Sequence, residues 1–109
     1  MGRQPVDPTP RDAEEHRIAL RKPVRLRAQL RDRSHTKFDI DVVDLSTTGF
    51  RLNTVFNLPV ETIVWITLPK LAGLEATVAW RDRQSALYGC RFTTPLHPAV
   101  FDHIVAMSA

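Results

Sequence analysis

A two-residue alternation that begins after Pro23 constrains the fold of this chain most strongly. Apolar residues at every second position of residues 24–31 alternate with charged or polar ones, which predicts a strand with one buried face. Similar short runs, separated by turn-forming residues, recur over residues 38–45, 50–52, 63–68, 74–81 and 88–92. Six short strands indicate an all-β fold, a small antiparallel barrel or sandwich.

Both ends of the chain depart from this pattern. Residues 1–15 are polar, contain three of the eight prolines and are expected to form a flexible tail. After Pro98, apolar residues recur at helical spacing, so residues 97–107 are predicted to form one short helix. We therefore expect one domain over residues 16–109, with its strands in residues 24–93.

The second predicted strand changes phase near its end. Ile40 and Val42 are expected to point inward, but Val43 and Leu45 then take over as the apolar positions. A slip of one residue is typical of a β-bulge or a strand end. It falls at Asp44, where the segment Asp-Leu-Ser-Thr-Thr-Gly begins.

This segment and two upstream arginines together predict a binding site. Asp44 and Ser46 are two residues apart, which puts their side chains on one face of extended backbone, where both can accept hydrogen bonds. Arg17 and Arg21 can donate to phosphate oxygens or to the O6/N7 edge of guanine. A guanine nucleotide offers partners of both kinds.

Charge is unevenly distributed along the chain. Residues 1–37 hold ten Lys/Arg and five Asp/Glu, whereas residues 38–109 hold five and seven. The basic part favours an anionic partner, although a solvated basic strand and tail explains the charge equally well.

Several classes of function find no support in the sequence. The four histidines lack metal-ligand spacing, no serine or cysteine has a paired base, and no glycine-rich phosphate loop is present, so we expect neither catalysis nor a metal site. No apolar run is long enough to cross a membrane, and residues 1–15 lack the apolar core of a secretion signal. With the single cysteine Cys90, this makes a cytoplasmic location the default expectation.

Three motifs in order resemble those of the PilZ domain family. They are Arg-x-x-x-Arg at Arg17–Arg21, Asp-x-Ser-x-x-Gly at Asp44–Gly49, and Tyr-Gly-x-x-Phe at Tyr88–Phe92, and the similarity extends over about residues 16–105. PilZ domains are bacterial receptors for cyclic di-GMP. The resemblance implies a six-stranded antiparallel β-barrel with helical additions, an arginine-bearing segment over residues 16–23 that wraps the ligand, and no other cofactor.

The resemblance also implies roles for single residues. Arg17 and Arg21 would contact the guanine edge and the phosphates of cyclic di-GMP, and Asp44 and Ser46 would read the guanine edge and nearby polar atoms. Gly49 would allow a tight turn and a close backbone approach. The family often has a tryptophan late in the barrel that packs near a ligand base, and Trp80 occupies the corresponding place.

Structural alternatives exist for most of these residues. Asp44 and Ser46 are also suited to capping a turn. Trp80 is in phase with the buried positions of its strand, so it suits the core as well as it suits stacking on a ligand. Arg21 and Arg25 form a second Arg-x-x-x-Arg register, but Arg25 is expected to be fixed on the outer face of a strand.

The sequence also departs from the family pattern. The family commonly has a second arginine beside the first, whereas here Arg17 is flanked by His16 and Ile18. This thinner positive charge, together with the apolar stretch Ile63–Leu68, favours an alternative in which the barrel binds no nucleotide and acts as an adaptor between proteins. A generic nucleic-acid binder is disfavoured because few aromatic side chains are available for stacking. A downstream protein partner is expected under the first two hypotheses.

Overall fold

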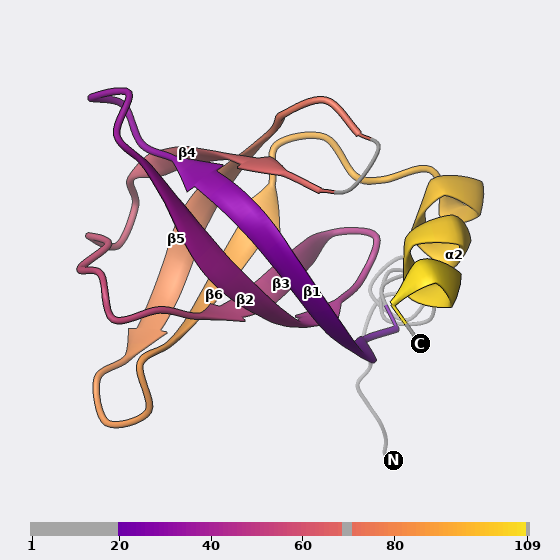
Figure 1. The fold of residues 1–109 in the computed structure, drawn as a ribbon, viewed down its shortest axis with the longest axis horizontal. Coiled ribbons are helices and arrows are strands. Elements are labelled where there is room, and N and C mark those ends of the chain that lie inside the picture. Colours follow the sequence, from indigo (N-terminus) through magenta and orange to yellow (C-terminus); the bar gives the residue numbers. More distant parts are fainter. Residues whose placement is uncertain (1–19, 69–70, 109) are drawn as a thin grey trace, which may run out of the picture.

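The computed structural model describes residues 20–68 and 71–108 of the chain. Its elements are β1 (Lys22–Arg31), β2 (Lys37–Leu45), β3 (Gly49–Asn53), β4 (Ile63–Thr67), β5 (Leu74–Asp82), β6 (Leu87–Phe92) and α2 (Pro98–Met107). The six strands close into one antiparallel barrel in the order β1-β2-β3-β6-β5-β4, as Figure 1 shows. The predicted fold, a six-stranded antiparallel barrel with one short C-terminal helix, is therefore confirmed.

The alternation in β1 creates its buried face. Its apolar side chains at positions 24, 26, 28 and 30 are buried, whereas the intervening positions are exposed. The same rule buries Ile40, Phe50 and Val64 on neighbouring strands, so the barrel interior is filled by one continuous apolar core.

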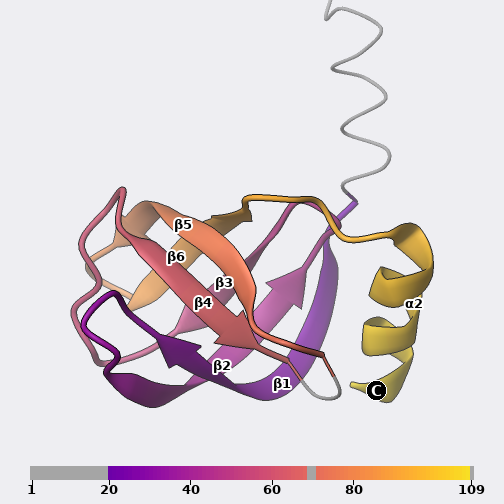
Figure 2. The same cartoon turned by 90° about the horizontal axis from the view of Figure 1, so that it is seen from above.

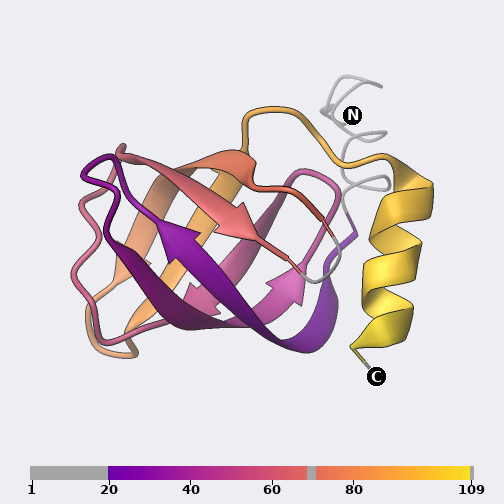
Figure 3. The same ribbon diagram turned by 45° about the horizontal axis from the view of Figure 1, so that its top comes forward.

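Helix α2 lies at one end of the barrel, beside the start of β1 (Figures 2 and 3). Pro98 opens it, and the Nδ1 atom of His97 accepts a hydrogen bond from the backbone N–H of Ala99 as its N-terminal cap. Phe101 and Ile104 of the helix are buried and join the barrel core. The helix thus covers apolar surface that the strands leave open at this end.

The loop after β3 is fastened to the barrel by Tyr88. Its buried hydroxyl donates to the carbonyl oxygen of Phe56 at 2.9 Å and accepts from the N–H of Leu58 at 3.2 Å. Phe56 also packs against Phe38, with 4.6 Å between the ring centroids. This loop therefore has a defined shape although Val55 and Phe56 are exposed.

Three of the ladders contain a register shift. Between β1 and β2 it falls between Pro23 and Leu26, and the other two are β-bulges. Between β2 and β3 the register shifts from Val42 to Asp44, and between β5 and β6 it shifts from Val78 to Trp80. Each bulge adds one residue to one strand and reverses which face the following side chain occupies. The first bulge was predicted from the sequence. The second was not, and it turns Trp80 out of the core phase of β5.

In the part of the chain that the structure describes, no helix has the length and apolar character that a membrane span requires.

Candidate functional site

One row of residues crosses the outer surface of the barrel. Asp44 on β2 is paired in register with Arg51 on β3, Arg51 with Gly89 on β6, and Gly89 with Trp80 on β5. Residues in register on neighbouring strands of one face lie side by side. The row therefore brings a carboxylate, a guanidinium and an indole onto one surface, from segments that are far apart in sequence.

Asp44 is the electrostatic centre of this row. Only 4% of the residue is exposed, yet its carboxylate has two partners. One oxygen accepts from Nη1 of Arg21 at 3.0 Å, and the other accepts from the guanidinium of Arg51. Two cations compensate the burial of one anion, and this small cluster keeps a net positive charge.

Ser46 builds the turn that follows Asp44. Its hydroxyl accepts from the backbone N–H groups of Thr48 (3.2 Å) and Gly49 (3.1 Å), and its own N–H donates to the carbonyl oxygen of Gly49 at 2.8 Å. Ser46 is only 1% exposed. In this conformation it shapes the turn between β2 and β3 rather than facing solvent.

Gly49 and Gly89 are glycines for steric reasons. A Cβ on Gly49 would lie 2.2 Å from the carbonyl oxygen of Cys90, which is backbone and cannot move aside. A Cβ on Gly89 would lie 2.1 Å from Nε1 of Trp80, because the indole ring rests directly on this residue. The glycines let two strands and one ring approach closely.

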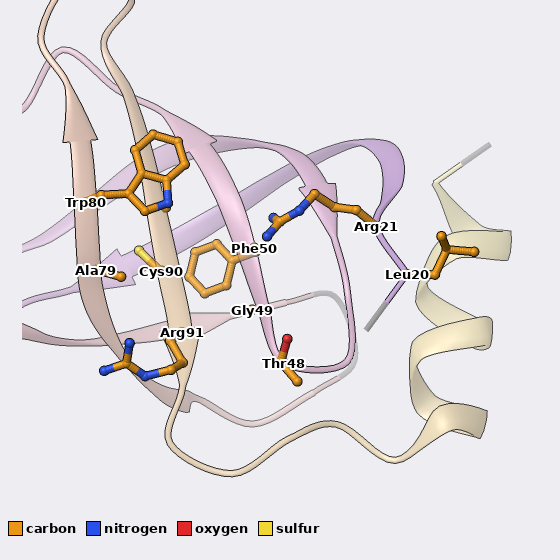
Figure 4. Close-up of a pocket in the computed structure, with 10 residues that line it drawn as sticks. Leu20, Arg21, Thr48, Gly49, Phe50, Ala79, Trp80, Cys90 and Arg91 are labelled. Carbon is orange, nitrogen blue, oxygen red and sulfur yellow. The ribbon is translucent and has the colours of Figure 1, made fainter. Parts of the chain in front are cut away.

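Trp80 is 40% exposed, so one side of its ring covers Gly89 while part of it remains open to solvent. Beside it lies a hollow of about 630 Å³, drawn in Figure 4. The hollow is lined by residues before β1, in the turn after β2 and on three strands: Leu20, Arg21, Thr48, Gly49, Phe50, Ala79, Trp80, Gly89, Cys90 and Arg91. An aromatic ring, hydroxyl and guanidinium groups and bare backbone thus surround a volume large enough for a nucleotide.

Cys90 has no chemical role that its environment supports. It is buried, and burial raises the pKa of its thiol to about 12. The thiolate is therefore scarce at neutral pH, and the side chain acts as a small apolar residue beneath the hollow.

The structure brings some of the predicted site residues together. Arg21, Gly49 and Trp80 line the hollow, and Asp44 is linked to it through Arg21. Ser46 does not line the hollow but holds the turn beside it through its hydrogen bond with Gly49. Arg17 and the predicted tail lie outside the described residues. Sequence reasoning missed Arg51 as a partner of Asp44. The sequence did contain a signal for Arg51, because it lies two residues after Gly49 and therefore on the same face of the strand β3.

Comparison with known proteins agrees with this geometry. The family model of the PilZ domain matches residues 12–109. Among solved structures, the PilZ domain of CeSA from a cellulose-synthesizing bacterium is similar, with a TM-score of 0.57 and 14% sequence identity over 81% of this chain and 93% of that chain. No curated protein matches the sequence significantly. Because the family model covers most of the sequence, the chain belongs to the PilZ domain family.

Proposed function

We propose that this domain is a receptor for cyclic di-GMP that binds the ligand in the hollow beside Trp80. Membership in the PilZ family, whose domains bind this second messenger rather than catalyse a reaction, supports the proposal. The observation that carries it is the position of Arg21. This residue precedes β1 in sequence, yet it lines the hollow and bonds to Asp44 at the end of the row.

The groups around the hollow suit a guanine nucleotide. The open part of the Trp80 ring offers a stacking surface for a purine, and such stacking contributes about 1–3 kcal/mol per base. The Arg21 guanidinium can donate to phosphate or to the O6/N7 edge of guanine. Gly49 and Gly89 also line the hollow, and because the Trp80 ring lies over Gly89, a ligand at that position would meet the indole.

The ion pairs of Asp44 suggest how binding is transmitted. With 48% of its side chain exposed, Arg21 can exchange Asp44 for the ligand, while Arg51 stays on the carboxylate and keeps it compensated. Residues ahead of β1 would then move with Arg21. Holding the Arg21 side chain on the ligand costs conformational entropy, which charge-assisted hydrogen bonds of roughly 1.5–3 kcal/mol each offset. The changed position of this segment is the proposed output to a partner protein.

Calorimetric titration of the full chain tests the proposal, with GTP and cyclic GMP as control ligands. We expect cyclic di-GMP to bind more tightly than either control. Arg21→Ala should weaken binding by roughly 10- to 100-fold, because a charge-assisted contact is lost. Arg25→Ala, which removes the same charge from the outer face of β1, is the matched control. Absence of heat and of chemical-shift changes at near-millimolar cyclic di-GMP would refute the proposal, and a larger effect of Arg25→Ala would favour the Arg21/Arg25 register.

A second candidate function is that of a nucleotide-independent adaptor. The stretch Ile63–Leu68 no longer supports it, because Val64, Ile66 and Leu68 point into the core. The exposed side chains of Val55, Phe56 and Val60, in the loop between β3 and β4, favour it instead. An adaptor of this kind would bind its partner equally well with and without cyclic di-GMP. If the Arg21→Ala variant lost partner binding only when the nucleotide is present, this result would count against the adaptor function.

A further inference from the structure

Arg91 lies on the opposite side of the hollow from Arg21. It projects from β6, whereas Arg21 comes from the segment before β1, and Figure 4 shows the two guanidinium groups on either side of the β3 segment that begins at Gly49. Arg91 is paired in register with Gly49, which also lines the hollow. The turn residue Thr48 also lines the hollow.

Within residues 20–68 and 71–108, Arg91 has no ion pair, whereas Arg21 and Arg51 share Asp44. Thr77 is its register neighbour on β5. The next acidic residue on that side of β5 is Glu75, whose carboxylate accepts a hydrogen bond from Thr93 at 2.8 Å. The exposed Arg91 guanidinium is therefore available to a ligand without first breaking a salt bridge.

We propose that Arg91 contacts the second phosphate of a cyclic dinucleotide whose first phosphate is bound by Arg21. This inference rests on the proposed function and deepens it. The two phosphodiesters of a cyclic dinucleotide lie on opposite sides of its sugar–phosphate ring, so a ligand across Gly49 presents one phosphate to each arginine. A guanidinium donates to phosphate oxygens in a forked geometry, and Thr48 can add a hydroxyl donor.

This assignment also accounts for the sparse positive charge of the segment before β1. Where the family commonly has a second arginine beside the first, this chain has His16 before Arg17 and Ile18 after it. Arg91 supplies a cation from the rigid sheet instead. A residue on a strand keeps its backbone position when the ligand binds, so it loses little conformational freedom.

The test is a titration of the full chain with cyclic di-GMP, comparing wild type with Arg91→Ala, Arg91→Lys and Arg83→Ala. Arg83 lies in the turn between β5 and β6 and does not line the hollow, so its loss controls for total charge. We expect Arg91→Ala to weaken binding roughly 10- to 100-fold, Arg91→Lys to weaken it less, and Arg83→Ala to leave it within about twofold. Thermal melting of each variant verifies that the barrel is folded.

Phosphorus NMR of the bound ligand provides an independent measurement. The asymmetric site should separate the resonances of the two phosphates, and Arg91→Lys should shift mainly one of them. If wild type binds but Arg91→Ala binds equally well, or if both resonances shift alike, the inference is wrong and the receptor function stands. If wild type does not bind, the receptor function fails and the inference fails with it.

Discussion

Two aspartates on β2, three residues apart, form ion pairs with arginines in different surroundings. Asp41 pairs with Arg27 at 2.9 Å, and both side chains are more than 60% exposed. Asp44 pairs with Arg21 and Arg51, and only 6% of its side chain is exposed. The chemical groups are the same, so the difference in burial decides what each pair does.

The exposed pair competes with water and salt, whereas the buried carboxylate depends on its partners. A surface ion pair typically contributes about 0–1 kcal/mol. A buried charge that loses its partner is destabilising by several kcal/mol, because it has also lost its hydration. We therefore expect Asp41 to be interchangeable with other polar residues, and Asp44 to require at least one arginine.

The largest effect is expected when both partners of Asp44 are removed. In the double variant Arg21→Ala/Arg51→Ala, the buried carboxylate is left without a cation, which should lower the free energy of unfolding by about 3 kcal/mol. Urea denaturation followed by circular dichroism measures it. Adding Asp44→Asn to the double variant should recover part of the loss. No recovery would mean that the uncompensated charge is not the cause.

Cys90 extends the comparison of buried and exposed ionisable groups, because it is buried and has no charged partner among the described residues. Burial raises the pKa of the Cys90 thiol to about 12 from its ordinary value of 9.0, so the unfolded chain loses this proton at lower pH than the folded chain. Stability is then fully present below about pH 9 and falls as the pH rises towards 12, by on the order of 2 kcal/mol between pH 9 and 11. The measurement is unfolding free energy against pH. Cys90→Ala should remove this part of the slope, and an unchanged slope would contradict the interpretation.

Removing one partner of Asp44 should have an intermediate effect. Arg51→Ala leaves Arg21 on the carboxylate, so we expect a loss of roughly 1.5 kcal/mol from the missing charge-assisted hydrogen bonds. Arg51→Lys should keep part of this stability, because it keeps the charge. Equal losses for the two variants in urea denaturation would show that the planar fork, rather than the charge, is what Asp44 needs.

The exposed pair should give the smallest effect. Arg27→Ala is expected to change the free energy of unfolding by less than about 0.5 kcal/mol, and by less again at high salt. Denaturation at low and high ionic strength checks this. A loss as large as that of Arg51→Ala would remove the distinction between the two aspartates.

Most of the fold could be predicted because each strand carries its own signal. The alternation in β1 and the phase change at Asp44 are both visible in the sequence, and the structure has the strand and the bulge. The bulge before Trp80 was not visible. A change of phase can be recognised in the sequence when a polar residue falls at a position that the alternation predicts to be inward. Trp80 falls at such a position but is apolar, so it extended the pattern of Ala76 and Val78 and the bulge left no signal.

The candidate site was less predictable, because it depends on which strands become neighbours. The motifs identified Asp44 and Gly49, but no local pattern indicates that β3 pairs with β6. Only that pairing brings Arg51 and Arg91 beside the glycines. Arg51 and Arg91 appear in the sequence as ordinary outward-facing residues of strands.

The extra residue at Ala79 has an evolutionary consequence. Deleting that single codon would restore a regular ladder between β5 and β6 and would place Trp80 directly after the inward-facing Val78, so the indole would still face outward over Gly89. The aromatic wall of the hollow would therefore survive an in-frame deletion at this position. Among relatives, the residue that corresponds to Trp80 is therefore to be identified by its pairing with the residue at Gly89, and not by its spacing from the core residues of β5.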